Sequence, residues 1–240
     1  MDGDIYRLLS NWPFELSAFT SDPSRSFISS FLASKGVASA KVFEFPTQVG
    51  TKKVISASPD NGFGITQYSD GTLYIGGVLN GQREGHGVRS YAGKALIYIG
   101  DYTRGKKSGR GRLLSLADGQ VLYDGEWRDD AKEGQGVLVY EKGTYEGSFK
   151  GDIFHGRGKL TWKGGDVYEG AFFEGQRTGF GVLRFPNGDA YEGEFLNGNF
   201  NGKGVYRWAT GESYAGSFEN GQAVGTGVVN YQVNAQGGSA

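Results

Sequence analysis

Residues 191–211 have the sequence YEGEFLNGNFNGKGVYRWATG, in which glycines follow the leading tyrosine by 2, 7, 11, 13 and 20 residues. Glycine weakens a strand by roughly 0.5 to 1 kcal/mol relative to alanine, so glycines at these fixed places need a structural reason. The same pattern starts at Tyr74, Tyr98, Tyr123, Tyr145, Tyr168, Tyr191 and Tyr214, with spacings of 24, 25, 22, 23, 23 and 23 residues. A fixed period in the twenties predicts a repeat array.

Each repeat contains two short alternating segments separated by a polar stretch. In the first segment, tyrosine, glycine and a large apolar residue occupy every second position, as in Tyr191, Gly193 and Phe195, which is the period of a strand. The second segment opens with the glycines 11 and 13 residues after the tyrosine, and the polar stretch carries glycine or aspartate at position seven, as a tight hairpin loop requires. Each repeat is therefore predicted to be one β-hairpin, with aromatic rings lying across the glycines.

Neighbouring hairpins are predicted to stack, because one hairpin cannot bury its apolar face alone. The predicted fold is an all-β repeat array, an elongated twisted antiparallel sheet of tandem β-hairpins with a short helical cap at its amino-terminal end. At about 4.8 Å per strand, fourteen strands would extend over roughly 65 to 70 Å.

The pattern divides the chain into four segments. Residues 1–50 show no repeat and form the predicted amino-terminal helical or capping segment, residues 74–231 hold the seven repeats, and residues 232–240 form a polar tail. Residues 51–73 are interpreted as a degenerate repeat, since Gly62 and Gly64 fall at the paired-glycine positions if Thr51 takes the place of the tyrosine.

A helix is predicted over residues 23–35, starting at Pro23 and stopped by Gly36, and a short strand over residues 42–45. The apolar side chains on one stripe of this helix are Phe27, Ile28, Phe31 and Leu32. Two interpretations stay open. The segment either covers the first edge of the sheet, which would otherwise invite aggregation, or provides a helix that docks on a partner.

Composition and charge exclude several classes of protein. The formal net charge of -1 gives no overall attraction to nucleic acid. The absence of cysteine excludes disulfides, thiol nucleophiles and cysteine-based zinc sites. The acidic start lacks the basic region of a signal peptide, and no stretch of about 18 apolar residues occurs, so the expected location is the cytoplasm.

No residue stands out as catalytic, cofactor-binding or metal-ligating. His86 and His155 each lie beside a glycine with no second histidine nearby, so both are interpreted as turn residues. The carboxylates that follow the tyrosines recur with the repeat and are interpreted as a solvated face. We therefore expect a protein that is not an enzyme and needs no cofactor.

One hairpin concentrates basic residues. Within YTRGKKSGRGR, residues 102–112, the basic side chains are Arg104, Lys106, Lys107, Arg110 and Arg112. We name these five residues the basic cluster. The cluster is interpreted either as a solvated loop or as a contact for an anionic lipid or an acidic protein surface.

The repeats resemble those of the MORN (membrane occupation and recognition nexus) family, whose unit runs Tyr-x-Gly-x-aromatic, a glycine loop and then Gly-x-Gly. Residues 168–188 (YEGAFFEGQRTGFGVLRFPNG) and 191–211 match this unit almost position by position. The resemblance implies a non-catalytic scaffold or adaptor that binds a protein partner at a membrane or cytoskeletal structure, often as a dimer. The alternative is a module that binds phosphoinositide-containing membranes through the basic cluster. The exposed last repeat favours a homodimer formed through the carboxy-terminal repeats.

Overall fold

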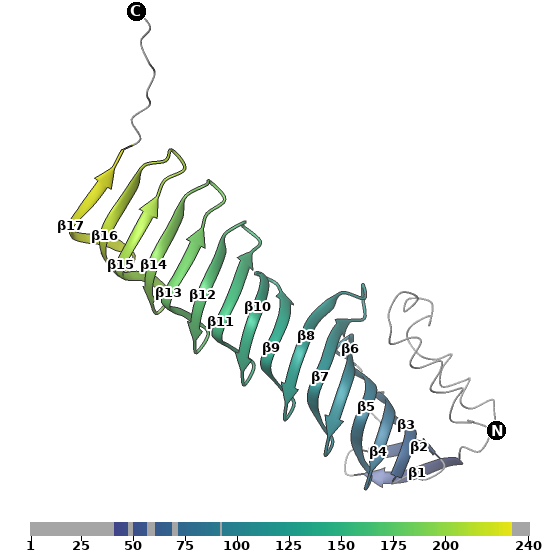
Figure 1. The fold of residues 1–240 in the computed structure, drawn as a ribbon. Helices are drawn as coiled ribbons and strands as arrows, with labels where there is room; N and C mark the ends of the chain where they lie inside the picture. The colour runs from purple at the N-terminus through teal and green to yellow at the C-terminus, as the bar shows by residue number, and fades with distance from the viewer. Residues whose placement is uncertain (1–40, 48–49, 57–60, 69–71, 92, 232–240) are drawn as a thin grey trace, which may run out of the picture. The chain divides into compact units, whose positions relative to one another are not determined.

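The computed structural model describes residues 41–47, 50–56, 61–68, 72–91 and 93–231, and it divides into two compact units, residues 1–131 and 132–240. Within the described residues the chain forms strands joined by turns, with no helix (Figure 1). The predicted helix at 23–35, with Phe27, Ile28, Phe31 and Leu32, lies outside the described residues, as does the tail at 232–240. The all-β fold of antiparallel hairpins predicted from the repeats is confirmed.

The first unit is an antiparallel sheet in which each strand pairs with the next along the chain. Its strands are β1 (Lys41–Thr47), β2 (Gly50–Ser56), β3 (Asn61–Gln67), β4 (Leu73–Leu79), β5 (Gln82–Tyr91), β6 (Leu96–Thr103), β7 (Lys106–Ser115) and β8 (Val121–Arg128). The strand predicted at 42–45 is the centre of β1. The segment interpreted as a degenerate repeat supplies β2 and β3, and Gly64 of β3 lies opposite Gly76 of β4.

The second unit follows the same antiparallel order. Its strands are β9 (Ala131–Tyr140), β10 (Gly143–Lys150), β11 (Ile153–Trp162), β12 (Val167–Phe173), β13 (Gln176–Arg184), β14 (Ala190–Leu196), β15 (Asn199–Arg207), β16 (Ser213–Glu219) and β17 (Gln222–Asn230). The two strands of a repeat, such as β14 and β15, form the predicted hairpin, and its second strand pairs in turn with the first strand of the next repeat.

The hairpin loops are two-residue turns in which both central residues have positive φ. In the sixth repeat these residues are Asn197 at 50° and Gly198 at 83°, as type I′ turns require. The N–H of Gly198 donates to the carbonyl oxygen of Arg177 in the preceding repeat at 3.0 Å. In the second to seventh repeats the turn therefore closes its own hairpin and is also hydrogen-bonded to the hairpin before it.

The paired glycines of a repeat serve different purposes. Gly202, eleven residues after Tyr191, has φ of 61° and lies where the register between β14 and β15 shifts, so it is a bulge residue. At Gly204 an added Cβ would lie 2.4 Å from the hydroxyl oxygen of Tyr191 and 2.6 Å from its ring carbon Cε2. The ring of Tyr191 therefore lies flat against the backbone, and it occupies the space that any larger residue at Gly204 would need.

The tyrosine hydroxyl explains why this position is tyrosine and not phenylalanine. Six of these hydroxyls donate to the carbonyl oxygen three residues later, at 2.8 to 3.1 Å: Tyr74, Tyr98, Tyr123, Tyr145, Tyr168 and Tyr191. The bulge after the glycine turns that carbonyl toward the ring side of the sheet. The hydrogen bond satisfies a polar group that would otherwise be buried without a partner.

We call the side of each sheet that carries the tyrosines the ring face and the opposite side the outer face. On the ring face the same six tyrosine side chains have no exposed surface. Tyr168 packs edge to face against Phe172 of its own repeat at 5.2 Å and against Phe195 of the next at 4.9 Å, measured between ring centroids. Tyr74, Tyr98, Tyr145 and Tyr191 contact a ring of the next repeat in the same way, so these rings form the core and join neighbouring repeats.

Candidate functional site

The structure separates the basic cluster between the two faces of the first sheet. Arg104 is the first residue of the turn between β6 and β7, with φ of 51°. Lys106, Arg110 and Arg112 are at outer-face positions of β7, whereas Lys107 is on the ring face, where its Nζ lies 3.7 Å from the centroid of the Trp127 ring. The five side chains therefore do not form one continuous basic surface.

Carboxylates already accompany several members of the basic cluster. Lys106 Nζ lies 3.2 Å from Asp129 Oδ1, and Arg112 Nε donates to Asp124 Oδ2 at 2.8 Å. Arg110 lies opposite Glu126 in the register between β7 and β8. Because these partners neutralise much of the positive charge, the exposed turn residue Arg104 and the exposed Arg110 are the members best placed to meet an anionic surface.

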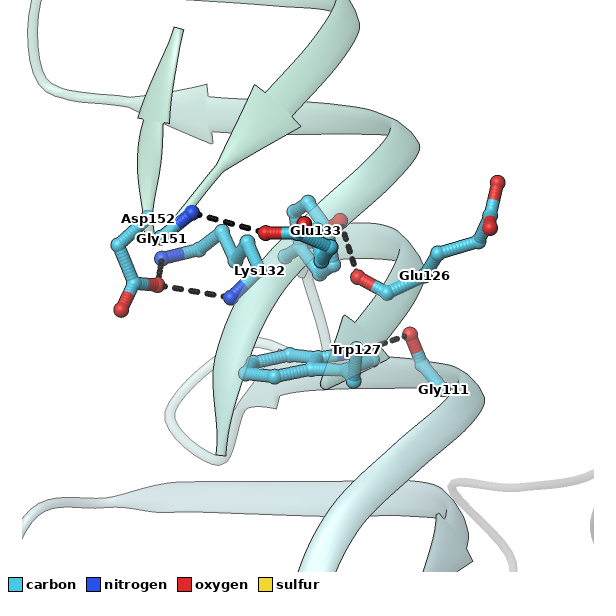
Figure 2. A network of polar contacts seen from close by, with 8 residues as sticks. Gly111, Glu126, Trp127, Lys132, Glu133, Gly151 and Asp152 are labelled. Carbon is cyan, nitrogen blue, oxygen red and sulfur yellow. Dashed lines mark hydrogen bonds and ion pairs between the residues drawn. The ribbon is translucent and has the colours of Figure 1, made fainter. Parts of the chain in front are cut away.

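Polar contacts join β8 to β7 in the first unit and hold the turn that follows β10 in the second. In the first unit Trp127 Nε1 donates to the carbonyl oxygen of Gly111 at 2.9 Å (Figure 2). In the second unit Lys132 donates to Asp152 Oδ1 through both its backbone nitrogen and Nζ, and the N–H of Gly151 donates to Glu133 Oε2 (Figure 2). These charged side chains therefore brace turns, and the structure accounts for them without a ligand.

The two histidines lie at exposed or half-buried positions near the turns. His86 Nδ1 is 2.9 Å from Asp101 Oδ1, and the ring of His155 lies 5.4 Å from that of Phe173. Among the residues that the structure describes, no group of three or more acidic or histidine side chains could hold a metal ion. A search of the same residues for a helix able to cross a membrane finds none.

The residue nine places after each tyrosine determines what covers the tyrosine ring. In two repeats it is a phenylalanine that stacks on the ring: Phe154 on Tyr145 and Phe200 on Tyr191, each pair with centroids 3.8 Å apart. In another it is Arg177, whose guanidinium carbon lies 5.6 Å from the Tyr168 centroid. At this position of the ring face, different side chains therefore cover the tyrosine ring in different repeats.

Burial shifts the titration of these tyrosines. Loss of hydration raises the pKa of Tyr145, Tyr168 and Tyr191 from 10.0 to about 12. In the unfolded chain the same phenols would ionise near their ordinary pKa of 10.0, so their contribution to stability is complete below that pH and is lost as the pH rises toward 12. We expect folding to be independent of these groups up to about pH 10 and alkaline unfolding to begin above it.

A pH titration followed by circular dichroism and by phenolate absorbance checks this expectation. The phenolate signal of the buried tyrosines should rise together with loss of the β-sheet signal. Ionisation of all fourteen tyrosines near their ordinary pKa with the sheet intact would contradict it.

The outer face of the second unit combines charges of both signs with exposed apolar side chains. Across β10, β11 and β12 the facing residues are Glu146, Lys159 and Glu169, and Lys159 Nζ lies 3.2 Å from Glu169 Oε1. Farther along, Arg207 pairs with Glu192 at 3.1 Å. Residues 132–240 contain ten lysines and arginines and twelve aspartates and glutamates, so no broad basic surface exists on this unit.

A shallow hollow of about 700 Å³ lies on this outer face across β13 to β17. Its lining includes Phe180, Glu192, Lys203, Val205, Arg207 and Val228. Phe180 and Val228 keep 62% and 61% of their surfaces exposed, although most apolar side chains of the chain are packed. Lys203 Nζ already donates to Ser217 Oγ at 2.9 Å, so the unsatisfied part of the hollow is apolar. We call this surface the outer hollow.

Buried rings and hairpins that repeat along the chain define a tandem β-hairpin repeat protein. The family model described as "MORN repeat" matches residues 74–94, 98–115, 123–144, 145–167, 168–190, 191–213 and 214–232. These segments are the seven repeats and make up more than half of the chain. The chain belongs to the MORN repeat family, whose repeats generally mediate interactions with proteins or membranes and are generally non-catalytic.

Two curated relatives share part of the repeat region. Alsin of Rattus norvegicus is 33% identical over 93 residues, which are 37% of this chain and 6% of alsin. MORN repeat-containing protein 3 of Xenopus laevis is 34% identical over 81 residues, which are 32% of this chain and 34% of that protein. The matched segment thus spans a small part of the first relative and about a third of the second.

Among solved structures, the chain is similar to the G-box domain of the microcephaly protein CPAP. The TM-score is 0.46 at 11% sequence identity, and the alignment covers 81% of this chain and 99% of that domain.

Sequence reasoning missed two features of the site. The hydrogen bond of the tyrosine hydroxyl was not predicted, although tyrosine and never phenylalanine at seven equivalent positions was a usable signal. The outer hollow was missed because its lining comes from five strands, and only the register between them brings Phe180 and Val228 to the same surface.

Proposed function

We propose that this chain is a non-catalytic scaffold or adaptor that binds a protein partner on the outer hollow of its second unit. The observation that carries the proposal is the exposure of Phe180 and Val228 on a rigid sheet whose neighbouring charges are already paired. Exposed apolar side chains of this kind mark interaction sites. A partner that presents apolar side chains would remove both residues from water without breaking the Glu192–Arg207 pair.

The pairing of charges favours a protein over a membrane as the partner of this surface. Anionic lipid attracts clustered lysine and arginine, at about 1 kcal/mol per residue, whereas the outer face of the second unit alternates Glu146, Lys159 and Glu169. A protein surface can complement such alternation residue by residue. The cytoplasm, at a membrane or a cytoskeletal structure, is the proposed location.

The test compares three full-length proteins as bait in affinity purification from the source cell with quantitative mass spectrometry. The first is the native chain, the second carries Phe180→Ser and Val228→Ser, and the third carries Leu79→Ser and Val121→Ser at exposed positions of the first unit. A protein recovered by the native chain and the third variant but not by the second supports the proposal. Measured with that protein purified, the affinity should fall about tenfold or more. Equal recovery by all three would overturn it.

The alternative function is binding of anionic phospholipid by the basic cluster. It depends on the three exposed members, Arg104, Lys106 and Arg110, although Lys106 also pairs with Asp129. Lys107 packs on Trp127, and Arg112 is half-buried beside Asp124. Vesicles of phosphatidylcholine with and without phosphatidylinositol bisphosphate test it against a variant in which Arg104, Lys106 and Arg110 are replaced by glutamate. Binding that needs the anionic lipid and disappears with the charge reversal would support this alternative; indifference to both would remove it.

Self-association through β17 is part of the proposed function. All nine residues of β17 are exposed, and its Val224 and Val229 are 36% and 43% exposed. An exposed strand edge tends to pair with a second copy of itself. We expect the sedimentation mass to rise from monomer to dimer with concentration.

Charged residues on β17 provide the matched variant. Val224→Lys together with Val229→Lys should keep the chain monomeric, because like charges would face each other across the interface. Leu79→Lys in the first unit is the control and should leave the dimer unchanged. A native chain that stays monomeric at every concentration would overturn this part of the proposal.

A further inference from the structure

The outer face of the first two repeats differs from that of all later repeats. The pairing registers place Ile75, Val88 and Ile99 directly opposite one another on β4, β5 and β6. A second row joins Leu73, Ser90, Ile97 and Leu114 on β4 to β7. At the far side of the first row this surface ends at the charged pair Arg112 and Asp124. We name the apolar part of these two rows the apolar outer patch.

The apolar outer patch is buried although it faces away from the tyrosine core. Ile75, Ile97 and Ile99 retain only 4%, 2% and 6% of their surfaces. The exposure of one residue type can be compared between repeats, because the position fourteen residues after the tyrosine is valine in several of them. It is 2% exposed at Val88, 37% at Val137 and 61% at Val228. Val228 lies on the last strand, which is paired on one side, but Val205 occupies the same place on a strand that is paired on both sides, as the strand of Val88 is, and it is only half-buried. A further part of the chain must therefore cover the patch.

The described strands do not supply this cover. Within the first unit, the described strands that reach the patch are the same strands that form it. The short segments that the structure does not describe, residues 48–49, 57–60, 69–71 and 92, contain too few residues to cover four strands. Residues 1–40 are the remaining long segment of this unit. Their sequence carries the amphipathic stripe of Phe27, Ile28, Phe31 and Leu32.

We infer that the predicted helix at residues 23–35 docks on the apolar outer patch of the same chain, with Phe27, Ile28, Phe31 and Leu32 against Ile75, Val88, Ile97 and Ile99. The dimensions agree. A helix of this length extends about 20 Å at 1.5 Å per residue, and the four strands β4 to β7 span about 15 to 19 Å at about 4.8 Å spacing. Both surfaces are apolar, and each would otherwise be exposed to water.

This docking decides between the two interpretations of the amino-terminal segment. The stripe is used within the chain and is not presented to a partner, and it covers a sheet face instead of the first edge. It also explains a departure from the repeat pattern. The residue after the tyrosine is acidic at Asp124, Glu146, Glu169 and Glu192, but it is isoleucine at Ile75 and Ile99, where the helix lies.

The absence of cysteine from the chain allows a direct test with single cysteine probes. The full chain carrying Val88→Cys is treated with a thiol reagent, and the labelling rate is compared with that of Val228→Cys, which is exposed. Each probe is then combined with Phe27→Asp and Phe31→Asp. The matched control replaces Ser26 and Ser30 by aspartate, on the other side of the predicted helix.

We expect Val88→Cys to react at least tenfold more slowly than Val228→Cys, and Phe27→Asp with Phe31→Asp to remove that protection. The serine control should retain the protection, and Val228→Cys should react alike in every background, while circular dichroism and an unchanged urea midpoint check that each variant keeps its sheet folded. Rapid labelling of Val88→Cys in the otherwise native chain would overturn the inference, as would protection that survives Phe27→Asp with Phe31→Asp. Protection that disappears on dilution would also overturn it, because a second copy would then be the cover.

Discussion

Replacing Tyr191 by alanine is expected to lower the free energy of unfolding by about 3 to 5 kcal/mol. The ring has no exposed surface and stacks on Phe200 at 3.8 Å. It also meets Phe195 and Phe218 edge to face at 5.2 and 5.0 Å, so one side chain connects two repeats. Its removal leaves a cavity and uncouples neighbouring hairpins. Urea unfolding followed by circular dichroism and by the fluorescence of the second unit's tryptophans measures the loss.

Tyr191→Phe separates the ring from its hydroxyl. This variant keeps every ring contact and loses only the hydrogen bonds of the hydroxyl, to the carbonyl oxygens of Glu194 at 3.0 Å and of Asn201 at 3.5 Å, so we expect a loss of about 1 kcal/mol. Equal losses for the alanine and phenylalanine variants would show that the hydroxyl, and not the ring, couples the repeats. A negligible loss for Tyr191→Ala would refute the role of the ring as core.

Replacing Gly204 by alanine is expected to destabilise the chain by about 1 to 3 kcal/mol, although alanine is the better residue for a strand interior. The added Cβ would lie 2.4 Å from the Tyr191 hydroxyl oxygen and 2.6 Å from two ring carbons. The ring cannot simply move away, because Phe200 stacks on it. The urea midpoint should therefore fall.

Gly164→Ala is the matched control for this substitution. The nearest atom to an added Cβ at Gly164 is Asp166 Oδ2 at 3.6 Å, an ordinary contact, so stability should change by less than about 0.5 kcal/mol. The loss at Gly204 should also shrink when Tyr191 is already alanine, since the two sites share one contact. Identical effects at Gly164 and Gly204 would contradict the steric explanation.

The repeat pattern predicted the hairpins well because its constraints are local. The tyrosine, the glycine two residues later and the paired glycines all act within one hairpin and its neighbour, and the period makes them visible in sequence. The assignment of glycine roles was incomplete. Sequence alone predicted rings across the glycines, which holds for Gly204, but Gly202 is needed for its positive φ at a bulge.

The outer face could not be predicted to the same extent. The five basic residues were grouped because they lie close together in the sequence of one hairpin. In the sheet, successive residues of a strand face opposite sides, so Lys107 packs on Trp127 on the ring face while Arg112 pairs with Asp124 on the outer face. The burial of Val88 and the exposure of Val228 are equally invisible in sequence, since both are valine at the same place in the repeat. Val88 lies between Ile75 and Ile99, whereas Val228 faces only Ala215 on the last strand, and these neighbours become known only once the register is known.

The hydrogen bond from each hairpin turn to the preceding one has an evolutionary consequence. In the second unit the turn residue at Asp152, Gly175, Gly198 and Gly221 donates to the hairpin before it at 3.0 Å in every case. A duplicated copy therefore finds the acceptor for its turn already in place, and it presents a carbonyl oxygen that accepts from the turn of the copy that follows. Recombination in steps of one repeat would shift the distance between two surface sites by about 10 Å, the width of two strands, without any new interface having to evolve.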